Sequence, residues 1–442
     1  MSAAQTPSQV PQPLATGQSK DMKKLNTQGL ALFALFLRVA TIAYAADPPA
    51  KIQALATPTS DNSAFPQLAE DGKGGVYMTW LETLKDGAGH RLRLAHRKEG
   101  GVWGEASTVQ EGKTFWRNWA DFPGVGIFPD GSVMVHWLAR SGEGTYDYNV
   151  NARISRDGGK TWGEPFLVNT DGKQAEHGFV SFAPTGKGLA VIWLDGRETK
   201  GMSHDAGEHS GGGAMTLRFA EFLSDGTRVR ELVLDSKVCD CCQTAVVNTP
   251  KGLLAAYRDR SDNEFRDISL VRPEALKPEP RDFSKDGWKI NACPVNGPAL
   301  AARGDVVSSA WFTMGGGKPR VKAAVSTDGG DTFSAPIEVD ATFPTGRVDI
   351  AMLPSGISLL SWLGRGEGGP EIKAAFLGTD GALKPAFKVA AGSIARAAGF
   401  PRLELSGGEV VFAWTEVGPT PESSTVPPPS QVRTALMSIR QR

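Results

Sequence analysis

Residues 122–140 read FPGVGIFPDGSVMVHWLAR: a short apolar stretch, a Pro-Asp-Gly turn, and a second apolar stretch that contains a tryptophan. Related units recur at residues 65–82, 178–198, 238–267, 296–313, 346–366 and 399–416. The aromatic residue of the second stretch is in turn Trp80, Trp137, Trp193, Tyr257, Trp311, Trp362 and Trp414. A repeat of about 50 residues that is built from short strands and glycine turns is typical of a β-propeller.

Each unit continues with a third strand, expected at residues 91–97, 150–155, 216–222, 266–272, 321–326, 372–377 and 431–439. A weaker fourth strand follows, as at residues 166–169 and 336–339, but the last unit lacks one before the chain ends. We expect residues 51–56 to supply it, because that closure leaves no free sheet edge. The prediction is an all-β propeller of four-stranded blades, seven in number, or six if one unit is degenerate. The repeated aromatic residues are expected to pack between neighbouring sheets.

The N-terminus is expected to be an export signal. Lys23 and Lys24 precede a mostly apolar run at residues 29–43, and Ala43-Tyr44-Ala45 fits a cleavage site. Residues 1–45 are therefore interpreted as an extension and a signal peptide, with Met22 as the hypothetical initiator, and residues 46–442 as one propeller domain. We expect a periplasmic or secreted monomer without a membrane span after cleavage; the alternative is a retained membrane anchor.

The charge of the chain is balanced, with 48 lysines and arginines against 48 aspartates and glutamates. This balance gives no support for nucleic-acid binding or for a polybasic membrane surface.

Two segments share a turn motif. Residues 155–162 (SRDGGKTW) and 326–333 (STDGGDTF) both read S-x-D-G-G-x-T-[WF]. In this turn the aspartate is expected to accept backbone N–H groups and glycine to take a positive φ. The motif is the Asp-box, or bacterial neuraminidase repeat, and through it the chain resembles the sialidase-like propellers. In that family the box lies between outer strands, away from the active site, so it bears on the fold.

The resemblance implies a glycosidase or lyase that acts on an anionic glycan. Sialidases use an arginine triad, a tyrosine activated by glutamate, and an aspartic acid. Here the catalytic candidates are Asp121, Asp349 and Arg347, while Tyr146 and Tyr148 are expected in a loop. Arg197, Glu198, Arg258, Arg260 and Arg365 are the candidate substrate contacts, because a guanidinium binds a carboxylate bidentately. The alternative is an internal ion-pair network at the channel mouth.

The cysteines are the least generic feature of the chain. Cys239, Cys241 and Cys242 precede the fourth unit, and Cys293 precedes the fifth, so the four thiols can converge. They can form two disulfides, a thiolate site for Zn²⁺ or Cu(I), or a redox-active cluster. The second functional hypothesis is therefore a non-enzymatic propeller that binds a ligand, or that handles a metal or a redox reaction through these cysteines. His204–His209 resembles a metal motif but is interpreted as a polar insertion.

Overall fold

The computed structural model describes residues 51–199, 213–419 and 428–439. The expected signal peptide, the proposed initiator Met22 and the segment His204–His209 lie outside these residues. Within the described ranges, no helix has the length and apolar character needed to cross a membrane.

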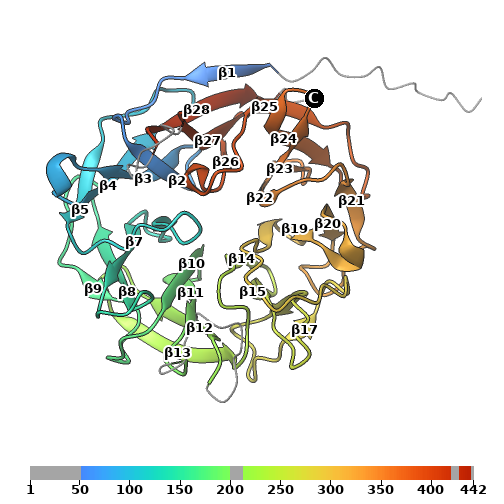
Figure 1. Ribbon diagram of the computed structural model, residues 1–442, viewed down its shortest axis with the longest axis horizontal. Helices are drawn as coiled ribbons and strands as arrows, with labels where there is room; N and C mark the ends of the chain where they lie inside the picture. The colour runs from blue at the N-terminus through green and yellow to red at the C-terminus, as the bar shows by residue number, and fades with distance from the viewer. Residues whose placement is uncertain (1–50, 200–212, 420–427, 440–442) are drawn as a thin grey trace, which may run out of the picture. The chain divides into compact units, whose positions relative to one another are not determined.

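Seven four-stranded antiparallel sheets form a ring around a central channel (Figure 1). The first strand of each blade lies nearest the channel and the fourth lies on the outside. This confirms the predicted propeller and decides for seven blades over six.

The blades follow one another along the chain. Blade 1 contains β2 (Ser63–Glu70), β3 (Val76–Thr83), β4 (His90–Arg97) and β5 (Ser107–Gly112); blade 2 contains β6 (Gly124–Ile127), β7 (Val133–Arg140), β8 (Tyr148–Ser155) and β9 (Phe166–Leu167). Blade 3 contains β10 (His177–Pro184), β11 (Leu189–Asp195), β12 (Thr216–Phe222) and β13 (Arg228–Asp235); blade 4 contains β14 (Ala245–Thr249), β15 (Gly252–Arg258), β16 (Ile268–Val271) and β17 (Arg281–Asp282). Blade 5 contains β18 (Ala299–Arg303), β19 (Val306–Thr313), β20 (Arg320–Ser326) and β21 (Ile337–Asp340); blade 6 contains β22 (Gly346–Met352), β23 (Ser358–Gly366), β24 (Gly369–Leu377) and β25 (Phe387–Ala391). Blade 7 contains β26 (Arg402–Ser406), β27 (Glu409–Val417), β28 (Ser430–Ser438) and β1 (Ile52–Leu55). Among the described residues, short 3-10 helices lie in loops: η1 (Lys85–Gly87), η3 (Gly315–Gly317) and η4 (Arg396–Ala398).

The second strand of a blade is buried on both faces, because a neighbouring blade packs against each side. In β11, with the sequence LAVIWLD, every residue is buried. Such a strand appears in the sequence as a continuous apolar run rather than an alternating one.

The repeated aromatic residues are structural, as expected. Their buried polar groups each need a hydrogen-bond partner. Trp193 donates to Asp195 at 2.8 Å, Trp311 to Asp286 at 2.7 Å, and Trp362 to Asp340 at 2.6 Å. The Tyr257 hydroxyl fills the same role in blade 4 and donates to Asp235 at 2.5 Å.

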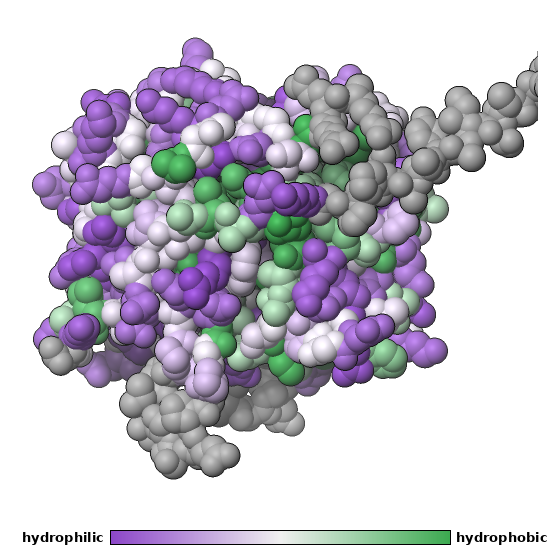
Figure 2. All heavy atoms as spheres, turned by 90° about the horizontal axis from the view of Figure 1, so that it is seen from above, coloured by the Kyte–Doolittle hydropathy of each residue, from purple (hydrophilic) through white to green (hydrophobic). Residues whose placement is uncertain are grey.

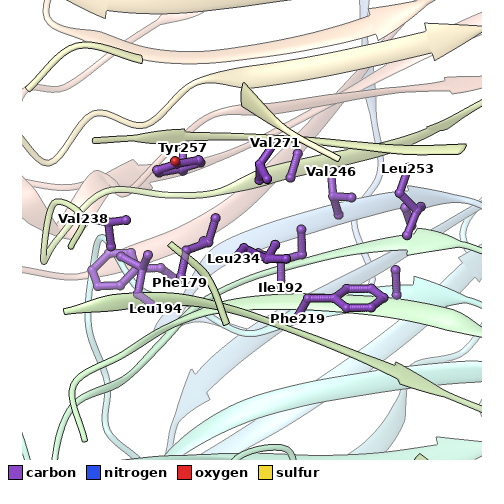
Figure 3. Close-up of a cluster of buried hydrophobic side chains, with 14 of the residues drawn as sticks. Phe179, Ile192, Leu194, Phe219, Leu234, Val238, Val246, Leu253, Tyr257 and Val271 are labelled. Carbon is purple, nitrogen blue, oxygen red and sulfur yellow. The ribbon is translucent and has the colours of Figure 1, made fainter. Parts of the chain in front are cut away.

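A hydrophobic cluster joins blades 3 and 4 (Figure 3). Ile192 and Phe219 of blade 3 face Val246 and Leu253 of blade 4. Val238 belongs to the same cluster and is directly followed by the first cysteine. The packing of two blades therefore fixes the position at which the cysteine loop begins.

The ring closes through β1. It pairs antiparallel with β28, with Ile52 opposite Met437 and Leu55 opposite Thr434. The strand expected at residues 51–56 thus completes blade 7, which confirms the predicted closure.

The two S-x-D-G-G-x-T turns have the expected hydrogen bonds. Asp157 accepts the backbone N–H groups of Lys160 and Thr161 at 3.0 and 2.9 Å. Asp328 accepts those of Asp331 and Thr332, both at 3.0 Å. Both turns join the third and fourth strands, on the outside of the ring.

The face of the molecule seen in Figure 2 is mostly hydrophilic, with apolar residues scattered among charged ones. Val102, Leu276 and Phe343 are among the most exposed apolar side chains, and they come from different parts of the ring. Exposed apolar residues that are dispersed in this way are ordinary for a protein surface.

We predict that removal of β1 destabilises the whole ring. A chain that starts at Thr57 leaves the β28 edge unpaired, and its thermal unfolding should begin several degrees below that of a chain starting at Lys51. Circular dichroism during heating measures this difference. Equal midpoints for the two chains would contradict a closing role for β1.

Candidate functional site

The central channel holds a cavity of about 600 Å³ that is lined by the first strands of all seven blades. Its polar lining includes Asp121, Gln243, Asp349, Arg402 and Glu404. Both predicted catalytic acids, Asp121 and Asp349, therefore line the same cavity.

The four cysteines converge beside this channel, at the junction of blades 4 and 5. The Sγ atom of Cys239 lies 3.5 Å from that of Cys242 and 4.0 Å from that of Cys241. The three Sγ atoms lie within 4.8 Å of one another. The thiol of Cys293 interacts with that of Cys241. All four cysteines are free, so the structure does not contain the two disulfides that the sequence left open.

Three different loops are locked together around the sulfur atoms. The Gln243 amide donates to the Ala120 carbonyl at 2.7 Å and accepts the Gly297 N–H at 3.0 Å. It thereby links the cysteine loop to the loops that precede β6 and β18. A side chain on Gly297 would overlap the backbone of Gln243, so glycine is required there for the close approach.

Arg258 carries a buried positive charge to the cluster. Its guanidinium donates to the carbonyls of Asn296 at 2.7 and 2.9 Å and of Phe312 at 2.8 Å, and it lies over the ring of Trp288. In the part of the chain that the structure describes, no carboxylate forms an ion pair with it. Cys242 is the group whose charge it favours electrostatically.

Arg266 is the second buried guanidinium beside the sulfur atoms. Only 1% of it is exposed, and it pairs with Glu264 at 2.6 Å. It also interacts with the sulfur of Cys239, and two of its buried nitrogens have no oxygen or nitrogen partner among the described residues. Arg260 is more fully paired, with Glu264 at 2.9 Å and Asp240 at 3.4 Å.

The thiols differ in their acidity. Burial raises the pKa of Cys239 to about 11 and raises that of Cys241 well above its usual value. Burial also acts on Cys242, but the neighbouring thiols, the charge of Arg258 and the Asn296 N–H outweigh it and hold the pKa well below the usual value. The interaction with Cys241 lowers the pKa of Cys293. The surroundings thus stabilise thiolate at one buried and one exposed position.

A buried acid cluster adjoins the cysteines. The Tyr148 hydroxyl lies 2.7 Å from Glu176 and 3.2 Å from Asp121. Burial raises the pKa of Asp121 to about 7 and that of Glu176 well above its usual value. The charges of Asp121, Asp240 and Cys293 also raise the pKa of Glu176, which shows that the two clusters interact.

The other predicted catalytic residues have internal partners. Arg347 donates to the carbonyls of Gly399 at 2.7 Å and Ile394 at 3.0 Å, and burial lowers its pKa to about 10. Asp349 lies 3.5 Å from Arg402 and accepts the N–H of Leu403.

The predicted substrate contacts do not gather in one place. Arg197 binds Asp195 at 2.7 Å, whereas Glu198 is exposed and Arg365 lies on a separate surface depression with Glu367. Arg258 and Arg260 are the two that lie at the cysteine cluster.

The surroundings of Arg197 form an ion-pair network. His177 Nε2 lies 3.2 Å from Asp171 and 3.6 Å from Asp195, while its Nδ1 faces the Tyr148 carbonyl at 3.0 Å. Burial lowers the pKa of His177, but the two carboxylates outweigh it and the net shift is upward. This geometry matches the internal network that the sequence offered as the alternative to anion binding.

Two residues of the site were missed from the sequence. Tyr148 was expected in a loop but is the first residue of β8, because its backbone continues the pairing with Arg140. Arg266 was counted only as the start of a strand. The sole signal for either was the polar character of the loops nearby.

Comparisons with known proteins support the architecture. No protein-family model matches the chain, and no curated protein matches its sequence. A lectin from Burkholderia pseudomallei is 13% identical, with a TM-score of 0.55 over 80% of this chain and 93% of the lectin. A variant of an α-L-arabinofuranosidase from Fusarium graminearum is 15% identical, with a TM-score of 0.50 over 88% of this chain and 97% of that chain. A Trypanosoma rangeli sialidase is 12% identical, with a TM-score of 0.45 over 76% of this chain and 57% of the sialidase. At these identities the similarity shows the propeller fold alone.

We predict that Asp121 makes stability fall with rising pH. Its raised pKa means that between about pH 4 and 7 the folded chain holds a proton that the unfolded chain has lost, so stability decreases across this window. Asp121→Asn should flatten the slope by up to about 1.4 kcal/mol per pH unit.

Denaturant unfolding at several pH values measures this slope. Asp262→Asn, at an exposed carboxylate, is the control and should keep the wild-type slope. An unchanged slope in Asp121→Asn would contradict the assignment.

Proposed function

We propose that this chain is a metal-handling propeller and that its functional site is the four-cysteine cluster. The ion it binds is thiophilic, either Zn²⁺ or Cu(I), because soft thiolate ligands select these ions. The observation that carries the proposal is the convergence of four free thiols beside the buried guanidiniums of Arg258 and Arg266.

The charge of the surroundings favours thiolates over disulfides. A disulfide is neutral and would leave Arg258 buried without a countercharge, which is costly in a protein interior. Thiolates that share a cation keep negative charge at the sulfur atoms and compensate the guanidiniums. Although burial opposes the shift, the neighbouring thiols of Cys239 and Cys241, followed by the charge of Arg258, lower the pKa of Cys242.

The spacing of the sulfur atoms also suits a shared ion. Zinc–sulfur bonds of about 2.3 Å place tetrahedral sulfurs about 3.8 Å apart. The Sγ separations of 3.5 and 4.0 Å from Cys239 to its two neighbours bracket this value. A disulfide requires about 2.05 Å.

The proposal includes the export of the protein from the cytoplasm. In an oxidising compartment free thiols tend to form disulfides, and a bound ion keeps them as thiolates. The site also lies beside the channel cavity, which Asp121 lines, and the charge of Cys293 acts on the neighbouring Glu176.

Metal titration of the reduced full-length chain tests the proposal. The wild type should bind an ion tightly, and Cys242→Ser should lose about two orders of magnitude or more in affinity. Inductively coupled plasma mass spectrometry and competition with a chelator measure binding.

A matched pair of arginine variants provides the control. Arg258 and Arg347 are both buried, donate to backbone carbonyls and lie over an aromatic ring, but of the two only Arg258 has a charge that acts on Cys242. Arg258→Met should weaken metal binding about 10–100-fold, whereas Arg347→Met should not. No binding by the wild type, or equal effects of the two variants, would overturn the proposal.

Cleavage of an anionic glycan is the second candidate function. The observation in its favour is that Tyr148, Glu176 and Asp121 form one hydrogen-bonded group. These are the residue types that the resemblance to sialidases implies for nucleophile, activating base and acid. It ranks second because all three residues are buried and because Arg258 and Arg347 are committed to backbone carbonyls.

If the chain cleaves glycans, Tyr148→Phe should abolish turnover because it removes the hydroxyl that contacts both acids. Tyr146→Phe, two residues away and partly exposed, should retain activity. Release of reducing sugar from sialylated and uronate-containing glycans is the assay. Absence of turnover by the wild type on this panel would reject this second function.

A further inference from the structure

The four thiols are not equivalent: three lie close together and the fourth lies outside that group. Cys239, Cys241 and Cys242 lie within 4.8 Å of one another, and Cys293 is outside this group. The cysteine loop supplies the three, whereas Cys293 comes from the loop between β17 and β18. Its thiol interacts with the thiol of Cys241.

The solvent exposure of the cysteines also separates Cys293 from the other three. Cys239 and Cys242 are 1% and 2% exposed, Cys241 is intermediate, and Cys293 is exposed. The thiols therefore form a path from the surface to the interior, from Cys293 through Cys241 to the two buried sulfur atoms. The neighbours of Cys293 in sequence, Asn291 and Ala292, are exposed as well.

This arrangement does not suit a closed zinc site. Structural zinc is almost always held by four ligands in a tetrahedron and is shielded from solvent exchange. Cu(I) is equally thiophilic and does not require a fourth ligand, so the three close thiolates suffice for it. A fourth thiol at the surface is then left to exchange ligands.

From this geometry we infer that the ion is Cu(I), held by Cys239, Cys241 and Cys242, and that Cys293 passes it to or from a copper carrier whose own ligands are thiolates. The inference rests on the proposed metal-binding function and adds the identity of the ion, its exchangeable character and the chemistry of the partner.

The exchange step involves no change of oxidation state. The Cys293 thiolate forms a bond to the carrier-bound Cu(I), and one bond from copper to a carrier sulfur breaks. Cys241 then binds the ion as its thiol loses a proton, and the released carrier thiolate takes up a proton. The ion then moves inward: the Cys242 thiolate replaces Cys293, which returns to its free thiolate form, and Cys239 replaces the remaining carrier ligand. The Cys239 thiol loses its proton in this step, and the released carrier thiolate takes up a proton.

Buried positive charge favours this direction of transfer. Arg266 lies at Cys239 and Arg258 acts on Cys242, so the copper trithiolate, which carries net negative charge, is stabilised at the inner position. At the outer position, Cys293 has solvent on one side.

The experiment compares rate with affinity in two serine variants. Full-length protein, kept reduced and anaerobic, is mixed with the Cu(I)–glutathione complex, and transfer is followed by ultraviolet thiolate-to-copper absorption. Affinity is measured separately by competition with a chelator that is specific for Cu(I). X-ray absorption gives the number of sulfur ligands, at the copper edge for the Cu(I)-loaded protein and at the zinc edge for protein loaded with Zn²⁺.

Cys293→Ser should slow transfer more than about tenfold, lower affinity less than about tenfold, and keep three sulfur ligands. Cys239→Ser should lower affinity about 100-fold or more. Equal losses of affinity in the two variants, with four sulfurs around Zn²⁺, would overturn this inference and leave metal binding intact. Failure of the wild type to bind either ion would overturn the proposed function itself.

Discussion

The charge of Arg258 is the constraint on which the rest of the site depends. A guanidinium that is 1% exposed must satisfy its donors and its charge within the protein. Backbone carbonyls of Asn296, Arg266 and Phe312 satisfy the donors and draw three segments together. Carbonyls are neutral, so the positive charge of Arg258 must be compensated by negative charge on the sulfur atoms. The cysteine cluster and the arginine are therefore best understood as one electrostatic unit.

The propeller gives this unit its rigidity. Each blade buries its second strand between two neighbours, and closure by β1 leaves no sheet edge at which the ring can open. The hydrophobic cluster between blades 3 and 4 includes Val238, one residue before the first cysteine, and Cys241 packs against it. Gln243 then joins the loops of three blades. Ligands on such a frame are positioned before an ion arrives, which reduces the conformational cost of binding.

The fold was predictable from the sequence because its determinants are local and repeated. Apolar strands, glycine turns and one aromatic residue per unit occur seven times, so a weak signal in one unit is supported by the others. The convergence of Cys293 with the other three cysteines also followed, since neighbouring blades place their inner-strand loops side by side. The orientation of the polar side chains could not be predicted from the sequence. Arg347 is the second residue of β22 and donates to carbonyls of the loop before β26, whereas Arg258 is the last residue of β15 and its charge acts on Cys242. Nothing in the sequence indicates this difference. Tyr148 and Glu176 form a pair only because β8 begins earlier than its apolar pattern suggests.

The most direct test of the account is a crystal structure of the protein purified without chelator, with anomalous diffraction collected at the copper and zinc absorption edges. The account predicts an anomalous peak bonded to the Sγ atoms of Cys239, Cys241 and Cys242, with Arg258 and Arg266 in their present positions. Two disulfides among the four cysteines, with no peak beside them, would contradict it and make the cysteines structural cross-links between blades 4 and 5.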